Sequence, residues 1–437
     1  MRQPVNTDIG QFTHEGDKYS IDVRLQYKVG NREDGISLTQ SNISDIEISV
    51  ALNRLYSDGF IVYKDVEGEI SRIIGVFNVV CSISFSQYEQ QGDGDFDSEK
   101  MDEKQSLYHT FMVDNVKIVD NNESSITYCI YLRGTEYQQL LNNVDYSDYQ
   151  LDEQPNLVEK IKAILVGYGK LQTDNSFDSV TSGVKFNYIS NGNDTVMSSI
   201  DYILQKQFFI ADSTDEGMKF LVYDILENKY GIFQFGQSTS GTMTTLIMSM
   251  NYSEMEEFVS SEKIMLASTS DIGKSNALLS MSDITMRTYD INSNTFAKRD
   301  YESGTIVKFF GGNTEENKMV PLRSGVETNI ARDVSEWSND TNIYNDFVDV
   351  FSKWDSIVVN CGGVINRKLM SVVNIGIDSR VEMSEGDTTE DAIRNMTRYR
   401  QLEGCWFITK VRYIIRPDRG TFKQSLRLSR TNNQIGK

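Results

Sequence analysis

The sequence contains few of the residues that usually build metal centres and nucleophilic active sites. Its 437 residues include two histidines, His14 and His109, and no Cys-x-x-Cys pair among four cysteines. Protein zinc sites need several Cys or His ligands at short spacing, and neither histidine lies in a G-x-S-x-G nucleophile elbow. We therefore predict that the chain binds no metal and no cofactor. Both histidines are expected at the surface or in turns.

The four cysteines are far apart, and each lies in an apolar or alternating run that is typical of a strand. They are Cys81, Cys129, Cys361 and Cys405. A free cysteine in such a setting behaves as a small hydrophobic residue. We predict buried free thiols at these positions.

Long hydrophobic runs and prolines are also scarce. No stretch approaches the roughly 18 uncharged apolar residues that a membrane helix needs, and the N-terminal residues MRQPVNTDIG contain no apolar signal region. The chain has four prolines, while 39% of its residues are hydrophobic and 11% are aromatic. This composition is typical of a folded, strand-rich protein. We expect a soluble chain of several domains without membrane insertion.

The charge balance argues against a protein that grips nucleic acid. The formal net charge is −20, from 63 acidic and 43 basic residues. Nucleic-acid binders concentrate Lys and Arg, and the sequence has no helix-turn-helix, zinc-finger or aromatic-basic sheet signature. The acidic excess is compatible with a surface along which DNA moves without binding.

The first quarter of the chain has the period-two alternation of β-strands. In "YSIDVRLQYKVG" the apolar residues occupy alternate positions, and "DIEISVALNRLYSDGFIVYKD" adds two strands around an SDG turn. "GVFNVVCSISFSQYE" and "SITYCIYLRG" predict two further strands. Short strands separated by turn residues, with almost no helical pattern, indicate an antiparallel barrel or sandwich. We assign it to residues 1–135.

Helical periodicity appears only after these strands. "PNLVEKIKAILVGYG" and "DTVMSSIDYILQKQF" repeat apolar residues at helical spacing, so we assign residues 136–215 to a helical or mixed domain. "KFLVYDILENKYGIFQF" then predicts a hairpin, and "NIYNDFVDVFSKW" predicts a helix before strands return. We group residues 216–236 with 342–437 as a second barrel. The weakly periodic residues 237–341 are assigned to an inserted α+β segment.

Two short motifs are too incomplete to define a site. Gly273-Lys274-Ser275 resembles the end of a phosphate-binding loop, but Ser268 replaces the earlier glycine. The acidic segment around Asp95 has calcium-loop spacing without the required Gly and bidentate Glu. A glycoside hydrolase uses a pair of carboxylates, and with 63 acidic residues in the chain the sequence does not single out such a pair.

The C-terminal segment reverses the charge of the rest of the chain. From residue 404 onward there are eight basic residues and one acid, a net charge of +7, so residues 1–403 carry −27. Alternation in "FITKVRYIIRPDRGTFKQSLRLSR" predicts two strands around a Pro-Asp-Arg-Gly turn. The outward-facing cations are Lys410, Arg412, Arg416, Lys423 and Arg427. We treat them as interface candidates that meet an acidic neighbour, with a solvated sheet face as the alternative.

The order of these elements resembles that of the baseplate hub proteins of contractile-tailed bacteriophages. These tail-tube initiators are related to the N-terminal part of type VI secretion spike proteins. The resemblance rests on "DIEISVALNRLYSDGFIVYKD", on "DTVMSSIDYILQKQFFIADSTDEGMKFLVYDILENKYGIFQF", and on the region from Ile343 through "SIVVNCGG" and "VVNIGI" to "GCWFITKVRYIIRPDRGTFKQSLRLSRTN". It is a likeness of pattern and element order.

Two positions depart from the pattern of that family. Its members often have a Pro-Gly turn before the penultimate strand, where this chain has Arg367-Lys368-Leu369-Met370. They also often place a histidine in the last hairpin, where Tyr413 stands here.

The resemblance implies an α+β fold with two antiparallel tail-tube-like β-barrel domains and inserted helical and mixed α/β segments. It implies a homotrimeric structural component of the virion, located in the tail baseplate and assembled in the host cytoplasm. Such a hub joins a spike protein to the tail tube protein, contacts other baseplate proteins and lines a channel for DNA. It is not expected to be an enzyme. A tail-associated glycan hydrolase or carbohydrate-binding module is the alternative.

Overall fold

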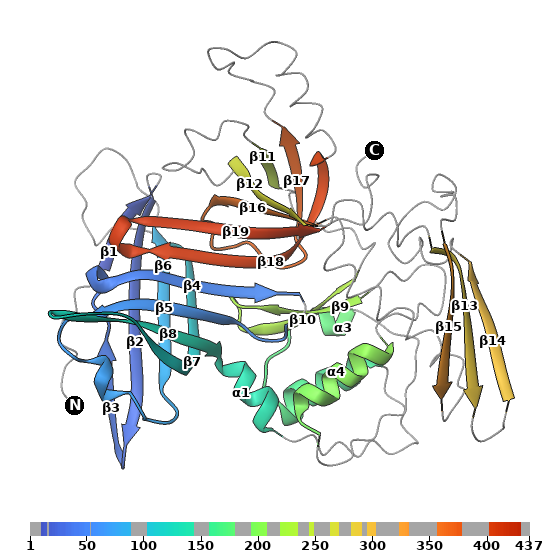
Figure 1. Cartoon of the computed structure of the whole chain (residues 1–437), viewed down its shortest axis with the longest axis horizontal. Helices are drawn as coiled ribbons and strands as arrows, with labels where there is room; N and C mark the ends of the chain where they lie inside the picture. The colour runs from blue at the N-terminus through green and yellow to red at the C-terminus, as the bar shows by residue number, and fades with distance from the viewer. Residues whose placement is uncertain are drawn as a thin grey trace, which may run out of the picture.

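The fold is built mainly from β-strands (Figure 1). The structure is a computed structural model, and it describes residues 10–14, 17–52, 54–88, 103–143, 157–179, 194–207, 219–234, 244–248, 263–270, 281–290, 295–302, 323–331, 356–377 and 402–429. The predicted helix at 343–354, the acidic segment around Asp95 and the Gly-Lys-Ser motif lie outside these ranges.

Eight N-terminal strands form one part of a 14-stranded sheet. Their order is β1-β2-β6-β7-β8-β5-β4, with β3 also paired to β2, and every pairing among them is antiparallel. Their bounds are Gly10–His14 (β1), Asp17–Val29 (β2), Arg32–Ser37 (β3), Ile43–Ala51 (β4), Asp58–Asp65 (β5), Val80–Tyr88 (β6), Glu103–Asn122 (β7) and Ser125–Gly134 (β8). On β2, the alternate residues Ile21, Val23, Leu25 and Tyr27 are buried, as the alternation predicts.

The sheet continues from β4 into the C-terminal part of the chain. Strand β18 (Gly404–Arg416) pairs with β4 along Lys410–Ile415, so residues more than 350 positions apart in sequence lie side by side. From β18 the pairing runs through β17 (Val372–Ile377), β11 (Thr244–Met248), β12 (Lys263–Ser270), β16 (Ser356–Gly362) and β19 (Thr421–Ser429). Because β19 also pairs with β18, these six strands form a closed circuit of pairings.

The pairing in this second group corrects two details of the sequence prediction. Strand β11 runs parallel to both β12 and β17, whereas an all-antiparallel arrangement was expected. Strands β11 and β12 come from residues 237–341, which were assigned to an insert, yet they pair with β17 and β16, two strands of the large sheet that follow the insert in the sequence. Short parallel strands reached by long connections leave no hairpin signature in the sequence.

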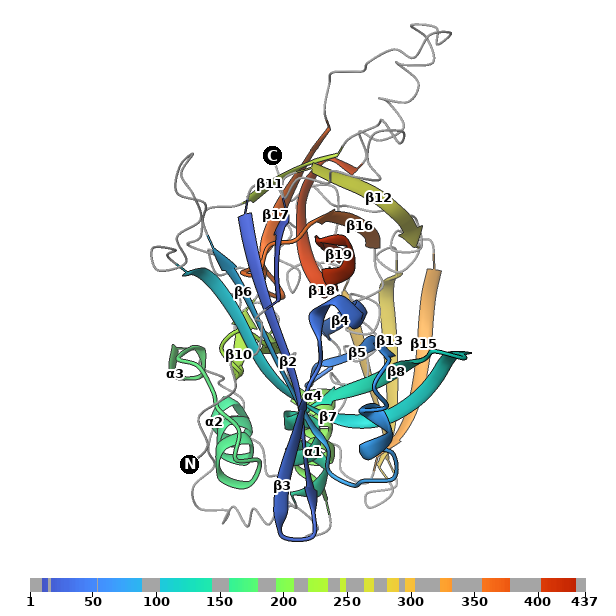
Figure 2. The same ribbon diagram turned by 90° about the vertical axis from the view of Figure 1, so that its left-hand side faces the viewer.

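A cluster of helices lies at the end of the sheet remote from β11 and β17 (Figures 1 and 2). The described helices are α1 (Thr135–Asn142), α2 (Leu157–Ala163), α3 (Ser176–Ser179) and α4 (Val196–Gln207). Helix α2 continues into a π-helical turn, Ile164–Tyr168, and its apolar face is buried, as the spacing predicts. None of the described helices is long and apolar enough to cross a membrane.

Two smaller sheets complete the described structure. Strands β9 (Lys219–Asp224) and β10 (Lys229–Gln234) form the predicted hairpin, but as a two-stranded sheet of their own and not as part of the large sheet. Strand β13 (Met281–Asp290) pairs antiparallel with β14 (Thr295–Glu302) and parallel with β15 (Arg323–Ala331). This three-stranded sheet stands apart from the large one (Figure 1).

Aromatic packing joins the two groups of the large sheet. The ring of Phe422 on β19 contacts Tyr19 of β2 and Phe85 of β6, with centroids 5.6 and 4.8 Å apart. Each of these three side chains is buried, so the interior is shared between the N-terminal and C-terminal strands. Of the four cysteines, Cys81, Cys129 and Cys361 are buried free thiols as predicted, and Cys405 is only partly buried.

Candidate assembly interface

The five predicted interface cations lie on the two strands of the C-terminal hairpin. Their side chains alternate with buried residues on β18 and β19, so the predicted division into a core face and an outer face is confirmed. On the core side, Val411, Ile415 and Leu426 are fully buried. The five cations are all partly exposed.

Part of the acidic neighbour that the charge reversal predicted lies in the same chain. The Nε atom of Arg412 is 3.0 Å from Oε1 of Glu47, and Nε of Arg416 is 2.6 Å from Oδ1 of Asp45. Both carboxylates stand on β4, the strand that connects the two parts of the sheet. Burial raises the pKa of Glu47 while Arg412 opposes this shift. The pairs lie partly in solvent, so each contributes at most about 1 kcal/mol.

Lys410 and Arg427 form a different arrangement. They are direct cross-strand neighbours in the β18–β19 pairing, and Lys410 faces Ala51 on the β4 side. Like charges placed opposite each other on neighbouring strands are destabilising. The pKa of Lys410 is lowered, first by burial and then by the charge of Arg412. Lys410 and Arg427, together with Arg412 in its ion pair with Glu47, form a row of cationic side chains, which we call the cationic seam.

A buried polar network lies where the first strands meet the helices. The hydroxyl of Ser57 donates to Oε1 of Glu136 at 2.7 Å and lies 2.8 Å from Nε2 of His109. The backbone N–H of Ser57 donates to the same carboxylate oxygen at 2.7 Å. His109 is 2% exposed, which corrects the expectation of a surface or turn position. It alternates with buried Leu107 and Phe111 on β7, and this period-two position could have revealed it.

The network contains Ser, His and Glu but does not have the geometry of a catalytic triad. The single hydroxyl proton of Ser57 goes to Glu136, so Nε2 of His109 is the donor to Ser57 and cannot also accept its proton. Glu136 approaches the same ring nitrogen, at 3.4 Å, and not the opposite one as in a triad. All three residues are buried. The arrangement links the residue before β5 to β7 and α1, and the burial of all three side chains leaves no access for a substrate.

The same junction holds the hairpin β9–β10. The hydroxyl of Tyr230 donates to the carbonyl oxygen of Leu55 at 2.5 Å, and Tyr223 packs on the ring of His109. Burial raises the pKa of both tyrosines, and the charge of Glu136 raises it further. Both side chains are buried and protonated at neutral pH, so this contact of the hairpin with the first strands is uncharged on the hairpin side.

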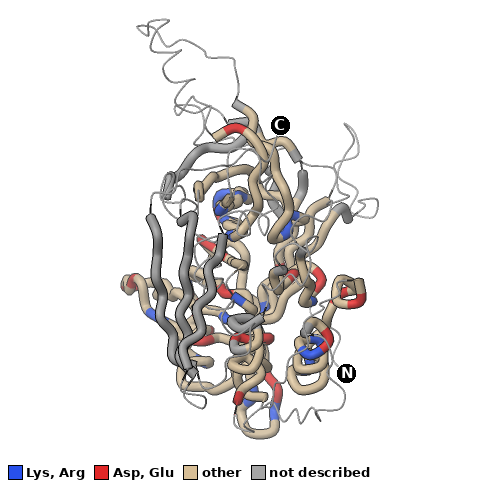
Figure 3. Tube along the Cα trace, turned by 90° about the vertical axis from the view of Figure 1, so that its right-hand side faces the viewer, with Lys and Arg blue, Asp and Glu red and all other residues tan. Residues whose placement is uncertain are grey.

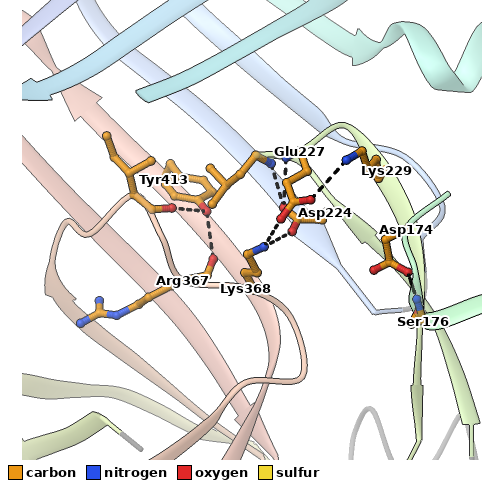
Figure 4. Close-up of polar contacts among 10 residues, drawn as sticks. Asp174, Ser176, Asp224, Glu227, Lys229, Arg367, Lys368 and Tyr413 are labelled. Atoms are coloured by element: carbon orange, nitrogen blue, oxygen red, sulfur yellow. Dashed lines mark hydrogen bonds and ion pairs between the residues drawn. The ribbon is translucent and has the colours of Figure 1, made fainter. Parts of the chain in front are cut away.

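The other side of the hairpin is held by a charged clamp (Figure 4). Nζ of Lys368 lies 2.6 Å from Asp224 and 2.7 Å from Glu227, both at the β9–β10 turn. Hydrogen bonds from Lys368 and its charge lower the pKa of Glu227. Burial lowers the pKa of Lys368, but the two carboxylates outweigh it, so the net shift is upward. The clamp connects the hairpin to the loop between β16 and β17.

The side chain of Arg367, the residue before Lys368, points toward strands β16 and β19. Its guanidinium donates to the side-chain oxygen of Gln424 at 2.7 Å and to the carbonyl of Gly362 at 3.2 Å. It also lies against the sulfur of Cys361. Gln424 in turn donates to the carbonyl of Val364 at 2.6 Å. These contacts hold the loop without the Pro-Gly turn that the resemblance led us to expect.

Within the described part of the chain, no group of three or more His, Cys, Asp or Glu side chains is placed to hold a metal ion. Lys and Arg as well as Asp and Glu are distributed over the described strands and helices (Figure 3). The features with a distinct chemical character are therefore the cationic seam, the clamp and the buried network.

Comparison with solved structures identifies tail proteins, one of them from a prophage, as structural neighbours. A tail protein from Neisseria meningitidis MC58 has a TM-score of 0.50 and 11% identity, covering 95% of this chain and 97% of that one. The 43 kDa tail protein of prophage MuSo2 from Shewanella oneidensis has a TM-score of 0.49 and 11% identity, over 94% and 97% of the two chains. A chain of the Francisella PdpA-VgrG complex has a TM-score of 0.45 and 8% identity, over 96% and 59%.

Neither a protein-family model nor a curated protein matches the sequence. The likeness to the Neisseria tail protein extends over nearly the whole of both chains, and at this identity it is a likeness of fold. The resemblance predicted from the sequence is thereby confirmed at the level of the fold.

Proposed function

We propose that this chain is a structural hub of a contractile phage tail baseplate, which joins a central spike to the tail tube as a homotrimer. The observation that carries the proposal is the end-to-end match of its fold to the Neisseria tail protein, over 95% of one chain and 97% of the other. A match of this extent is expected when the whole chain, and not an isolated module, is adapted to one kind of assembly.

The two groups of strands support the threefold part of the proposal. We assign residues 1–135 to a first tube-like barrel, and β11, β12 and β16 to β19 to a second, with residues 136–215 between them. The pairing of β4 with β18 joins the two groups in register over six residues. Three copies would then present six similar modules, which suits a transition from a threefold spike to a sixfold tube. Such a ring requires heterologous contacts that close by rotation.

The charge of the chain suits a channel for DNA. With a net charge of −20, three copies would surround the axis with an acidic excess that repels a polyanion and prevents its arrest. In the proposed assembly the spike, the tail tube protein and other baseplate proteins are the partners, the virion tail is the location, and DNA passes without specific binding.

A structural role is favoured over a catalytic one. The buried Ser57, His109 and Glu136 are the group in the described residues that most resembles an active site, and neither its accessibility nor its proton arrangement fits catalysis. No described feature favours the alternative of a glycan hydrolase or a carbohydrate-binding module.

The test is the native mass of the purified 49.8 kDa chain, measured by sedimentation velocity across a wide concentration range. We expect a discrete species of three chains, and a ring with a central hole in electron micrographs. A stable dimer, or a monomer at every concentration, would contradict the homotrimer.

A further inference from the structure

One end of the first strand group exposes apolar and acidic side chains together. The β7–β8 hairpin turns at residues 123–124, and residues 119–124 are all exposed. The exposed fractions of Ile118 and Val119 are 58% and 62%. The adjacent strand β5 ends at the same edge of the sheet, because Asp65 of β5 pairs with Ile126 of β8, and Ile126 pairs with Asn121 of β7.

The residues that follow β5 also combine exposed apolar and acidic side chains. Val66 is 56% exposed and is followed by the exposed Glu67, while Asp120 and Glu123 are exposed at the hairpin turn. We call this set the hairpin end. It consists of Val66, Glu67, Ile118, Val119, Asp120 and Glu123. Exposed apolar side chains rimmed by charged ones are typical of protein interaction sites.

The hairpin end is stiffened by its own hydrogen bonds. The carboxylate of Asp120 accepts from the backbone N–H of Asn121 at 3.0 Å and from the side-chain amide of Asn122 at 2.8 Å. A turn held in this way loses little conformational freedom on binding, which favours association. Glu123 is the acid at this turn that can be changed without breaking these bonds.

The cationic seam carries the opposite charge to the hairpin end. Lys410 and Arg427 face each other across β18 and β19, and Arg412 is the next outward-facing residue on β18. Two like charges in a directly opposed pair are unfavourable in the isolated chain. An acidic protein surface placed over the seam removes this repulsion, so the seam is poised for a negatively charged partner.

We propose that the hairpin end of one copy of this chain docks on the cationic seam of the next copy. The inference rests on the proposed homotrimer, and it names the two different surfaces that a heterologous ring contact needs. A second copy is the favoured occupant because its hairpin end supplies acids for Lys410 and Arg427, whereas Arg412 already pairs with Glu47. It also supplies apolar side chains that are exposed in the single chain. The phosphates of duplex DNA are the competing source of negative charge.

The experiment is a charge exchange across the contact. Arg427→Glu reverses one charge of the seam, Glu123→Lys reverses one charge of the hairpin end, and the double variant exchanges the two charges across the contact. We expect each single variant to weaken self-association about ten-fold or more and the double variant to recover most of it, measured by sedimentation velocity. Arg32→Glu, on the exposed edge strand β3, is the matched control and should leave the mass unchanged. Circular dichroism confirms that each variant is folded.

The outcomes separate this inference from the proposed function. A trimer that withstands both single reversals, or that is lost without recovery in the double variant, overturns the docking model while leaving the homotrimer in place. A wild-type chain that never associates contradicts the proposed function itself. If fluorescence anisotropy shows that the wild type binds a duplex oligonucleotide and that only Arg427→Glu abolishes this binding without changing the mass, the seam is a DNA surface and the inference is wrong.

Discussion

The hydroxyl of Tyr413 donates a hydrogen bond to the backbone carbonyl of Arg367, with 3.2 Å between the oxygens. A second carbonyl, that of Ile365, lies 3.3 Å from the same hydroxyl. These positions are the two places where the sequence departs from the pattern of hub proteins, and the structure brings them into contact. The tyrosine therefore holds the loop that lacks the expected Pro-Gly turn. Burial raises the pKa of Tyr413, so the hydroxyl remains a donor at neutral pH.

Replacing Tyr413 with Phe should destabilise the chain through this loop. The ring stays packed, but the backbone carbonyls of the loop lose the one hydroxyl proton they share, which costs about 1 to 2 kcal/mol of the free energy of unfolding. Urea denaturation followed by tryptophan fluorescence measures the change. Tyr108→Phe is the control, because Tyr108 is 62% exposed and loses only a solvated hydroxyl. Equal stability of the two variants would show that the Tyr413 hydroxyl does not hold the loop.

The charged clamp should respond to salt. Lys368→Met removes both ion pairs to Asp224 and Glu227 but keeps the aliphatic stem, and the partly exposed partners limit the loss to about 1 kcal/mol at low ionic strength. At about 1 M NaCl screening should remove most of the difference between the wild type and the variant. Urea titrations at the two salt concentrations measure it. Lys28→Met, which breaks the exposed pair with Glu33, should have a smaller effect in low salt. A salt-independent difference for Lys368→Met would mean that packing, and not charge, holds the hairpin.

The buried network should make stability depend on pH. Burial raises the pKa of Glu136, but the hydrogen bond and charge of His109 and the donors of Ser57 outweigh burial and lower it below its usual 4.5. A carboxylate with a lowered pKa in the folded state stabilises the fold above its unfolded pKa, and this contribution is lost as the pH falls through the folded value. The wild type should therefore lose stability below about pH 4.5 through this residue.

Glu136→Gln isolates that contribution, since all other carboxylates are common to both proteins. The stability difference between the wild type and the variant should shrink as the pH falls from about 5 to about 3, measured by thermal melting at each pH. Glu33→Gln removes an exposed carboxylate outside the proposed contact and serves as the control. A difference that stays constant over this range would show that Glu136 contributes no charge-dependent stability.

The sequence was sufficient to predict elements whose pattern is local. Alternation placed the strand faces correctly on β2, β18 and β19, and helical spacing located α2 and α4, because each pattern depends on residues only a few positions apart. It could not predict that Glu47 pairs with Arg412, since nothing in either segment specifies a partner so distant in the chain. The parallel pairing of β11 was missed for the same reason.

His109 was misjudged for a different reason. The usual exposure of histidine suggested a surface position, although the period-two spacing with Leu107 and Phe111 indicated the core. A buried histidine needs polar partners, and the two that approach Nε2 of His109, Ser57 and Glu136, come from other parts of the chain. The pattern alone therefore predicts the face of the strand but not the network.

Strands β4 and β5 approach each other closely at Gly59, and β4 is the strand that pairs with β18 and so connects the two halves of the sheet. A substitution at Gly59 therefore tests this connection. A Cβ atom added at Gly59 would collide with the backbone carbonyl of Glu47, which cannot move without breaking the pairing of the two strands. Gly59→Ala should therefore cost about 2 kcal/mol or more and loosen β4, the strand that contacts β18. Gly167→Ala is the matched control, because no atom lies within contact distance of the added methyl group. Hydrogen exchange of the β4 and β18 amides should report the loosening directly. If exchange increases on β4 alone, the two halves are held together by the aromatic contacts of Phe422 more than by the backbone pairing.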